Sequence, residues 1–442
     1  MLWGGEWVGE RWWYRLAHVC QRWRDLILRS ASYLGLCLVC TYGTPVADML
    51  VHSPPLPLII DYYQNHDITA EDEEAIMLAL EQRDRVRRIR FAIPILNLQE
   101  FIMAIDGEYP ILEHLLLGDL RKDKNTVLIL PETLETPHLR HLAISCSIQI
   151  PIRSPLLGTA ASLIILNLHI YHPSTYFQPT VLLQWLSLMP QLEILMIFFF
   201  FAVPNRDVER QLMRTPILTH VTLPNLRAFG LQAVSAAYSE AVLCQITAPR
   251  LKAFQICYFK QLTFSVPQLL QFIGRTENFR FDRAEFHFTS SRVYVKVYPP
   301  EAKMAAFSMY IDCWHLDWQV SSVAQIFNAL SQMFSAVEHL TLAHRVHRRS
   351  SEEHNEVDRA EWRKLFRPFS NVKTLRIHLR LVEELSRCLQ LEDGEYPLEL
   401  LPELQELTYT RSGDANDAFT SFIDARQNAG RPVTLIKLKR RR

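Results

Sequence analysis

The sequence predicts an α/β fold, in which parallel strands and outer helices repeat as an irregular solenoid. Three observations lead to this prediction. An apolar phrase of the form Leu-x-x-Leu-x-Leu returns ten times, usually after a proline. Strand-like and helix-like patterns alternate along the chain, which is typical of parallel sheets. Each unit would also leave an apolar face that only its neighbour can cover, so the units must stack.

The ten phrases supply the strands of the expected array. Successive phrases begin 24–34 residues apart in the first series and 29–35 residues apart in the last, which leaves room for a helix between strands. The phrases are Leu112, Leu115 and Leu117; Leu139, Leu142 and Ile144; Leu163, Leu166 and Leu168; Leu192, Leu195 and Ile197; Leu226, Phe229 and Leu231; Leu251, Phe254 and Ile256; Val337, Leu340 and Leu342; Val372, Leu375 and Ile377; Leu404, Leu407 and Tyr409; and Val433, Ile436 and Leu438.

The chain before the first phrase shows the same alternation. Apolar residues at three- and four-residue spacing predict one amphipathic helix over residues 12–29. Thr69, with Asp72 three residues later, is a plausible N-cap arrangement. The other expected elements are strands at 34–39, 58–60 and 86–91 and helices at 45–51, 69–83 and 98–105.

The later part adds helices and one irregularity. Two alternating segments, 285–288 and 292–298, flank a Thr-Ser-Ser turn and predict a hairpin that interrupts the array near 279–300. Asp358 with Glu361 caps one expected helix. The expected helices are 320–334, 358–366, 382–391 and 415–428.

Composition excludes several classes of partner and compartment. Lys plus Arg equals Asp plus Glu at 47 each, so no global field favours nucleic acid or an anionic membrane. The most apolar run, 194–203, is too short to span a bilayer as a helix and is better interpreted as a buried strand. The start of the chain lacks the pattern of a signal peptide. The eight scattered cysteines favour reduced thiols, and hence a cytoplasmic or nuclear protein.

Residues 13–26 read Trp-Tyr-Arg-Leu-Ala-His-Val-Cys-Gln-Arg-Trp-Arg-Asp-Leu. This stretch resembles the second half of an F-box, and specifically the "VCRRWRD" helix of fungal F-box proteins with leucine-rich-repeat-like C-terminal regions. The phrases that begin at Pro110 and Pro190 also resemble that family. The resemblance covers nearly the whole chain.

The resemblance implies a domain organisation and a function. Residues 1–33 would be a partial F-box-like helix and N-terminal cap, and residues 34–442 an irregular leucine-rich-repeat-like solenoid. The F-box would dock on the Skp-type adaptor of a cullin-type (SCF) ubiquitin ligase, while the repeats hold an unknown protein substrate. Such a protein is not an enzyme and needs no cofactor. The implied adaptor-binding residues are Leu16, Val19, Cys20, Trp23 and Leu26.

The chain departs from the F-box pattern at its start. A full F-box begins with a Leu-Pro-x-Glu-type helix, and residues 1–11 contain no such segment. Two alternatives follow: a truncated F-box, or a leucine-rich-repeat interaction or scaffold protein without ligase binding. The helix could also simply cap the open end of the array, through Trp13, Trp23 and Leu26. Capping and docking are compatible.

Alternation along each phrase predicts which side chains face away from the core. In the middle of the array these include five apolar residues, which we interpret as a candidate partner-binding patch. The alternative is that loops or the hairpin bury it. The patch is Ile165, Ile194, Met196, Phe198 and Phe200. The other outward positions are His114, Leu116, His141, Ala143, Asn167, Gln255, His339, Thr341, Thr374, Arg376, Glu406 and Thr408.

Other motifs favour structural roles. Cys37 and Cys40 form a C-x-x-C without a second ligand pair, so we expect core thiols and no metal. His344, His347 and His354 fit no ligand spacing. The arginines between 83 and 90 form either a phosphate or acidic-partner patch, or a solvated face with a favourable helix C-terminal charge, and we favour the second. The basic end, 437–442, is either a nuclear import signal or a solvated tail. Phosphate-loop, nucleophile-elbow and His-Glu-x-x-His motifs are absent from the sequence.

Overall fold

The computed structural model describes twelve segments of the chain in two compact units. Unit 1 comprises Met1–Phe201 and Val221–Asn225, and unit 2 comprises Ala202–His220 and Leu226–Arg442. The described segments are residues 12–63, 68–119, 126–151, 154–200, 219–233, 235–259, 266–276, 279–345, 357–378, 381–390, 399–410 and 418–438.

The N-terminal segment of unit 1 is two helices, so the single helix predicted over residues 12–29 is wrong. Helix α1 (Trp12–Ala17) ends before an extended residue, Cys20, and α2 (Gln21–Arg29) begins after it. The break is stabilised by Arg24, whose Nε donates to the carbonyl of Ala17 at 3.1 Å. That bond satisfies a carbonyl that the end of α1 leaves without a partner in the helix.

Unit 1 contains a parallel sheet whose strands follow chain order. The pairs expected from the phrases are confirmed, since Leu115 lies opposite Leu142, Leu142 opposite Leu166, and Leu166 opposite Leu195. All four leucines are at most 1% exposed. The strands are β1 (Leu38–Cys40), β2 (Leu58–Tyr62), β3 (Val86–Ile93), β4 (His114–Asp119), β6 (His141–Ser145), β8 (Ile165–Ile170) and β9 (Ile194–Phe199).

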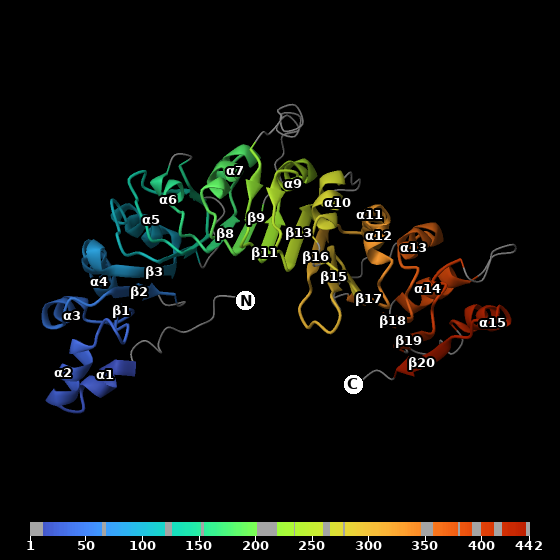
Figure 1. Ribbon diagram of the computed structural model, residues 1–442, viewed down its shortest axis with the longest axis horizontal. Helices are drawn as coiled ribbons and strands as arrows, with labels where there is room; N and C mark the ends of the chain where they lie inside the picture. Colours follow the sequence, from blue (N-terminus) through green and yellow to red (C-terminus); the bar gives the residue numbers. More distant parts are fainter. Residues whose placement is uncertain are drawn as a thin grey trace. The chain divides into compact units, whose positions relative to one another are not determined.

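Helices of unit 1 lie along one side of its sheet (Figure 1). We infer that they cover the row of buried leucines. The expected N-cap is confirmed: the Thr69 hydroxyl accepts from the backbone N–H of Asp72 at 3.1 Å, and the Asp72 carboxylate accepts from that of Thr69. The connecting elements are α3 (Val46–His52), α4 (Ala70–Glu81), η2 (Arg83–Arg85), α5 (Ile95–Ala104), β5 (Leu128–Ile129), β7 (Ile148–Gln149), α6 (Pro155–Gly158), η3 (Pro173–Thr175), α7 (Pro179–Ser187) and β10 (Val221–Thr222).

Unit 2 contains a mixed sheet in which one strand is antiparallel to its neighbours. The hairpin expected near 279–300 is present as β14 (Arg283–Thr289) and β15 (Arg292–Tyr298). An additional strand, β16 (Phe307–Asp312), pairs antiparallel with β15 and parallel with β13 (Ala253–Phe259). The hairpin therefore becomes part of the sheet, in the order β11-β13-β16-β15-β14-β17-β18-β19-β20. The remaining strands are β11 (Ala228–Gln232), β17 (His339–Arg345), β18 (Thr374–His378), β19 (Glu406–Thr410) and β20 (Thr434–Leu438).

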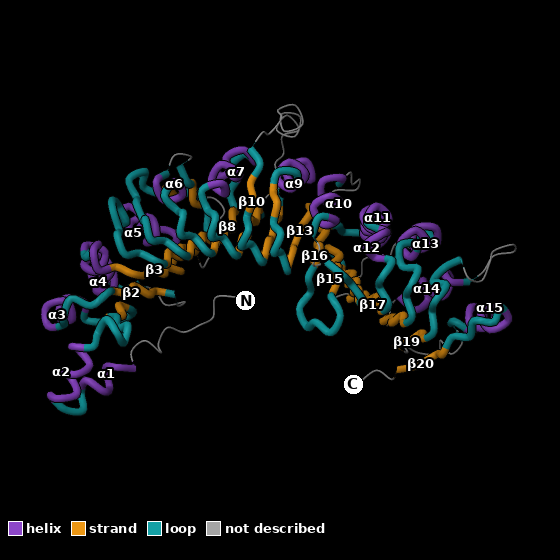
Figure 2. The backbone as a smooth tube through the Cα atoms, viewed as in Figure 1, coloured by secondary structure: helices purple, strands orange, loops and turns teal. Residues whose placement is uncertain are grey.

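Helices again line one side of the sheet in unit 2, and Figure 2 follows the loops that join them to the strands. Aromatic side chains fill the space between the layers, as in the contact between Phe254 and Phe272, whose ring centroids lie 5.1 Å apart. The elements are α9 (Ala236–Leu243), β12 (Ile246–Thr247), α10 (Pro267–Gly274), α11 (Leu316–Ala329), α12 (Ser331–Phe334), α13 (Arg359–Phe366), α14 (Val382–Leu389) and α15 (Thr420–Asn428).

The last phrase is displaced by one residue from its predicted register. Leu435, and not Ile436, lies opposite the core residue Leu407. Ile436 and Leu438 therefore share the outward face of β19 and β20 with Thr408 and Thr410. The reason is that β20 has apolar residues on both of its faces. Its own sequence therefore does not define the core face, and the pairing with β19 determines it.

Within the described part of the chain, no helix combines the length and the apolar character needed to cross a membrane.

Candidate interaction surface

Among the described residues, the helices of unit 1 lie along one side of its sheet and leave the opposite face without a covering helix (Figure 1). Along β8, Leu166, Leu168 and Ile170 are buried, while Ile165, Asn167 and His169 alternate with them and are half-buried. Parallel pairing repeats this alternation in β4, β6 and β9. Side chains of one outward position therefore form rows across the strands.

The structure brings the predicted apolar patch together on this face. Ile165 lies opposite Ile194, and Met196 lies opposite Asn167; the three apolar side chains are half-buried. Phe198 is on the predicted face but is only 8% exposed, so the expectation that it is an accessible contact is wrong. The reason is local packing: the ring of His169 meets it edge-on at 5.1 Å.

Phe200 follows the end of β9 and is 38% exposed. Its ring stacks on Tyr171 at 4.7 Å with an interplanar angle of 9°. It also lies 6.4 Å from the ring of Phe198. The accessible part of the patch therefore consists of Ile165, Ile194 and Met196, with Phe200 at its edge.

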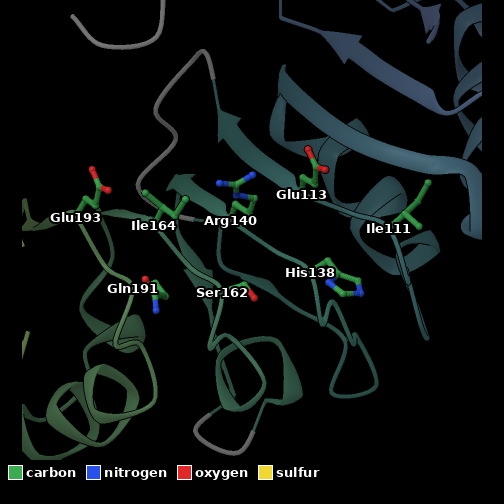
Figure 3. Close-up of a pocket in the computed structure, with 8 residues that line it drawn as sticks. All are labelled: Ile111, Glu113, His138, Arg140, Ser162, Ile164, Gln191 and Glu193. Atoms are coloured by element: carbon green, nitrogen blue, oxygen red, sulfur yellow. The ribbon is translucent and has the colours of Figure 1, made fainter. Parts of the chain in front are cut away.

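A groove of about 670 Å³ runs past the N-terminal ends of β4, β6, β8 and β9 (Figure 3). Four of its residues directly precede a strand, and their backbone N–H groups continue the ladder: Arg140 N donates to Glu113 O, and Glu193 N donates to Ile164 O. The lining residues are Ile111, Glu113, His138, Arg140, Ser162, Ile164, Gln191 and Glu193. The groove therefore presents side chains of both charges from successive repeats.

Two histidines meet where the groove adjoins the sheet face. His114 and His141 lie opposite each other on β4 and β6, with ring centroids 4.1 Å apart and planes at 85°. Burial lowers the pKa of His114 to about 3, helped by His141 and by neighbouring arginines. Burial, followed by Arg140, also lowers the pKa of His141. Both rings are therefore neutral near pH 7.

The sequence places both histidines on the outward face but does not single them out as a pair. The signal was present, because His114 and His141 occupy the same position in successive phrases. Equal positions in adjacent parallel strands become neighbours about 4.8 Å apart. The two rings come into contact because β4 and β6 pair in the register that places His114 opposite His141.

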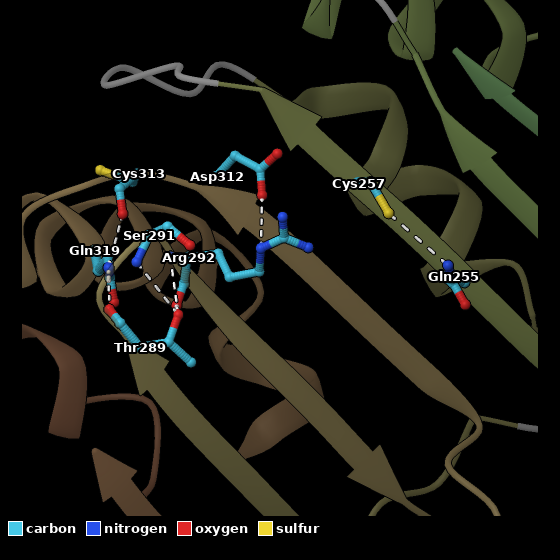
Figure 4. A network of polar contacts seen from close by, with 8 residues as sticks. All are labelled: Gln255, Cys257, Thr289, Ser291, Arg292, Asp312, Cys313 and Gln319. Carbon is cyan, nitrogen blue, oxygen red and sulfur yellow. Dashed lines mark hydrogen bonds and ion pairs between the residues drawn. The ribbon is translucent and has the colours of Figure 1, made fainter. Parts of the chain in front are cut away.

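Polar and charged side chains lie on the outward face of unit 2 at β15 and β16. Asp312 on β16 forms an ion pair with Arg292 on β15 at 3.2 Å. Gln319 on α11 donates to the carbonyls of Thr289 and Cys313 at 2.9 and 2.7 Å, which ties the β14–β15 turn to the end of β16 (Figure 4). The contacts of this network are internal to the unit, so we assign it a structural role. The outward positions predicted in β13, β17, β18 and β19 lie on this face.

The residues that the F-box resemblance assigns to adaptor binding lie on or between the two N-terminal helices and differ in their exposure. Trp13 is buried against β1, and its Nε1 donates to the carbonyl of Cys37 at 3.2 Å. Leu16 is half-buried, and Cys20 is exposed. The other three assigned side chains are exposed apolar groups: Val19 at 63%, Trp23 at 47% and Leu26 at 58%. One side of this helix pair therefore covers the sheet, and the other faces away from it.

The remaining motifs have ordinary surroundings. Cys37 and Cys40 are buried and form no disulfide. His344 is buried in β17, while His347, His354 and 439–442 lie outside the described residues. In the described segments no group of three or more His, Cys, Asp or Glu side chains is arranged to hold a metal ion.

The arginines between 83 and 90 are largely engaged by the protein itself. Arg85 Nε donates to the carbonyl of Leu56 at 3.2 Å. Arg90 pairs with Asp61 at 2.8 Å, and Arg87 pairs with Glu113 at 3.0 Å. These contacts join neighbouring strands and loops, so the segment is not simply a solvated face.

No protein-family model matches this chain, and no curated protein matches it.

Proposed function

We propose that this protein is a non-catalytic substrate-recognition adaptor of a cullin-type (SCF) ubiquitin ligase, in which a leucine-rich-repeat-like solenoid binds a protein target. The observation that carries the proposal is the exposed apolar side of α1 and α2. Val19, Trp23 and Leu26 remain accessible although the same helix pair buries Trp13 and Ile27. Exposed aromatic and aliphatic side chains that lie close in sequence commonly mark a protein contact.

The helix pair also has the position that a docking module needs. The phenol of Tyr14 accepts the backbone N–H of Val39 at 3.4 Å, which satisfies a donor on β1, the first strand of the sheet. An uncovered edge strand would invite pairing with another chain. We infer that α1 caps the array while α2 presents its apolar side to a Skp-type adaptor.

The sheet face of unit 1 supports the second half of the proposal. Rows of half-buried side chains from successive strands provide a surface on which an extended protein segment can lie. We propose that Ile165, Ile194 and Met196 contribute apolar contacts there. The array would serve as a rigid spacer that holds the target near the ubiquitin-conjugating enzyme, in the cytoplasm or nucleus.

Co-purification with a Skp-type adaptor tests the ligase connection. We expect the full chain to retain the adaptor, and Trp23→Asp with Leu26→Asp to lose it, because both changes place charges in a desolvated contact. Leu96→Asp is the matched control, since Leu96 is an exposed leucine (79%) on α5. Equal retention by the three proteins, or no retention by the full chain when it is folded, would reject the ligase role.

The alternative is a leucine-rich-repeat interaction or scaffold protein without ligase binding. The contacts of Trp13 with the Cys37 carbonyl and of Tyr14 with the Val39 N–H favour it, because they tie α1 to the edge of the sheet. In that case α1 and α2 act as a cap alone. The same co-purification separates the two functions, because a pure cap predicts no adaptor in any of the three samples.

A further inference from the structure

We propose that the outer edge of β20 binds an extended, acidic segment of a protein partner as an additional strand of the unit 2 sheet. This edge is separate from the helix pair and from the unit 1 sheet face, so binding there requires neither a Skp-type adaptor nor the target proposed above. Three features of β20 support the proposal: its pairing on one side, its exposure and the charge of the chain around it.

The pairing of β20 leaves backbone groups directed away from the sheet. Within the described residues, β20 is the last strand of the sheet and pairs only with β19 (Figure 1). The backbone N–H of Thr434 donates to the Gln405 carbonyl at 2.8 Å. Since alternate residues of a strand direct their backbone groups to opposite neighbours, the N–H and C=O of Leu435 point away from β19. An edge of this kind is a template for pairing with another chain.

The first strand of unit 1 shows how this protein closes an edge. All three residues of β1 are buried, and the N–H of Val39 is bonded to the Tyr14 hydroxyl. Along β20, by contrast, three of the five residues are exposed, and the other two, Leu435 and Ile436, are half-buried. Among the described residues, β20 therefore lacks the cover that β1 receives from α1.

The side chains of β20 suit an added strand on both faces. Leu435 lies on the core face opposite Leu407, whereas Ile436 and Leu438 lie on the outward face. Leu438 is 38% exposed. Apolar side chains on a neighbouring strand can pack beside these residues, because cross-strand pairs lie in contact. A strand that binds here therefore gains side-chain contacts in addition to backbone hydrogen bonds.

The charge of the chain around the edge favours an acidic partner. Residues 425–442 contain seven Lys and Arg residues and no Asp or Glu. Three of the seven are engaged within the protein. Arg426 is buried, and Arg431 pairs with Glu403 at 3.4 Å. Lys437 has contacts of its own. The remaining four, at 439–442, directly follow β20 in the sequence.

Neighbouring carboxylates do not cancel these four cations. The segment that follows β19, residues 411–417, contains one arginine and two aspartates, which leaves a positive balance. Glu406 on β19 lies opposite Thr434, at the start of β20 and away from the four cations. Carboxylates on an added strand would be attracted to this end of β20, and cations would be repelled.

A second copy of this chain fits the edge less well. If two β20 strands paired in parallel, their basic ends would lie side by side. If they paired antiparallel, each basic end would lie beside Arg431 of the other copy. Both arrangements bring like charges together, which is destabilising. We therefore assign the edge to a different protein whose extended segment carries Asp or Glu.

Isothermal titration calorimetry of the full chain with a short peptide of alternating glutamate and valine tests the site. We expect saturable binding, and roughly tenfold weaker binding of the same peptide with lysine in place of glutamate. No binding of either peptide would overturn the site, and equal affinity for both would overturn the preference for an acidic partner. Dimers of the full chain that Leu435→Pro abolishes would overturn the assignment to a different protein.

Leu435→Pro tests the backbone contact. Proline removes the N–H that points away from β19, and a strand tolerates proline at such edge positions. We expect roughly tenfold weaker binding of the glutamate peptide, with an unchanged circular dichroism spectrum. Leu435→Ala is the matched control, because it keeps the N–H and should weaken binding less than about threefold. Equal weakening by the two variants would overturn strand addition.

Hydrogen exchange in the unsubstituted chain tests the same contact without a variant. Saturating glutamate peptide should slow exchange at the Leu435 amide by roughly tenfold or more, because that N–H gains an acceptor. The Ile436 amide, which is directed towards β19, should change little. Unchanged exchange at Leu435 would show that the peptide does not pair with β20, and would overturn the proposal.

Discussion

The indole Nε1 of Trp13 donates a hydrogen bond at 3.2 Å to the carbonyl of Cys37, the residue directly before β1, and this contact fastens the first helix to the start of the first strand. Trp13 is buried, and its neighbour Tyr14 accepts the N–H of Val39. One contact satisfies a backbone group of the edge strand, and the other satisfies the carbonyl directly before it. The helix is therefore part of the folded array and is not a loosely attached tail.

Removal of the Trp13 ring should weaken this end of the protein. We expect Trp13→Ala to lower the free energy of unfolding by about 3–5 kcal/mol, because it leaves a cavity and an unpaired carbonyl. Trp12→Ala is the control, since Trp12 is 47% exposed and should cost less than about 1 kcal/mol. Urea unfolding gives both values. Similar losses for the two variants would contradict the capping role.

The Tyr14 hydroxyl offers a more local test. Tyr14→Phe removes the acceptor for Val39 N–H and little else, at a cost of about 1 kcal/mol. Hydrogen exchange should accelerate at the Val39 amide and remain unchanged in β8. Exchange at Val39 that matches the unsubstituted protein would show that the hydroxyl does not protect the edge.

The row of buried leucines formed by Leu115, Leu142, Leu166 and Leu195 should contribute much of the stability of unit 1. Leu166→Ala removes a fully buried side chain between Leu142 and Leu195, and should cost about 2–5 kcal/mol. Ile165→Ala, on the other face of the same strand, should cost clearly less because Ile165 is half-buried. Chemical denaturation of both variants decides the matter, and the reverse order would contradict the assignment of the two faces.

Arg426 should hold the end of unit 2 together. Its buried guanidinium donates to the carbonyls of Leu401, Pro402 and Leu404 at 3.0–3.1 Å. We expect Arg426→Met to cost about 3 kcal/mol through these lost charge-assisted bonds. Arg431→Met should cost less than about 1 kcal/mol, because the Arg431 pair with Glu403 is exposed. Thermal unfolding followed by circular dichroism compares the two variants, and equal melting temperatures would refute the role.

Glu384 should make the stability of unit 2 depend on pH. Burial raises the pKa of its carboxyl to about 7, against a partial opposing effect from the Trp362 Nε1 hydrogen bond. The unfolded chain ionises this group at lower pH than the folded chain does. The contribution of Glu384 to the free energy of unfolding is therefore largest below the unfolded pKa of 4.5. It falls as the pH rises towards 7, and at higher pH it stays low.

Glu384→Gln removes this titration. We expect the difference in unfolding free energy between pH 5 and pH 8 to shrink in the variant, with the larger change in the unsubstituted protein. Urea unfolding at the two pH values measures it. An identical pH dependence in both proteins would show that Glu384 is ionised in the folded state.

Local patterns predicted much of the fold, and long-range contacts determined what they missed. Thr69 and Asp72 act within one helical turn, so their cap could be read from spacing alone. The helix break at Cys20 is stabilised by the hydrogen bond from Arg24 Nε to the Ala17 carbonyl, and the spacing of apolar residues does not reveal that bond. The register of β20 depends on Leu407, because its own apolar residues fit either face.

The candidate site shows the same division. Alternation placed Ile165, Ile194 and Met196 on the outward face. It could not show that His169 would pack against Phe198, since that contact requires the register between β8 and β9. Nor did it show the ring contact between His114 and His141, since that contact requires the register between β4 and β6.

We propose that this chain carries two separable surfaces, an apolar helix side for a Skp-type adaptor and a sheet face for a protein target. Quantitative mass spectrometry of material co-purified with three forms of the protein tests it most directly. Trp23→Asp with Leu26→Asp should lose the adaptor and keep the target, whereas Ile165→Asp with Met196→Asp should keep the adaptor and lose the target. Loss of both partners from either folded variant, or of neither, would contradict the account.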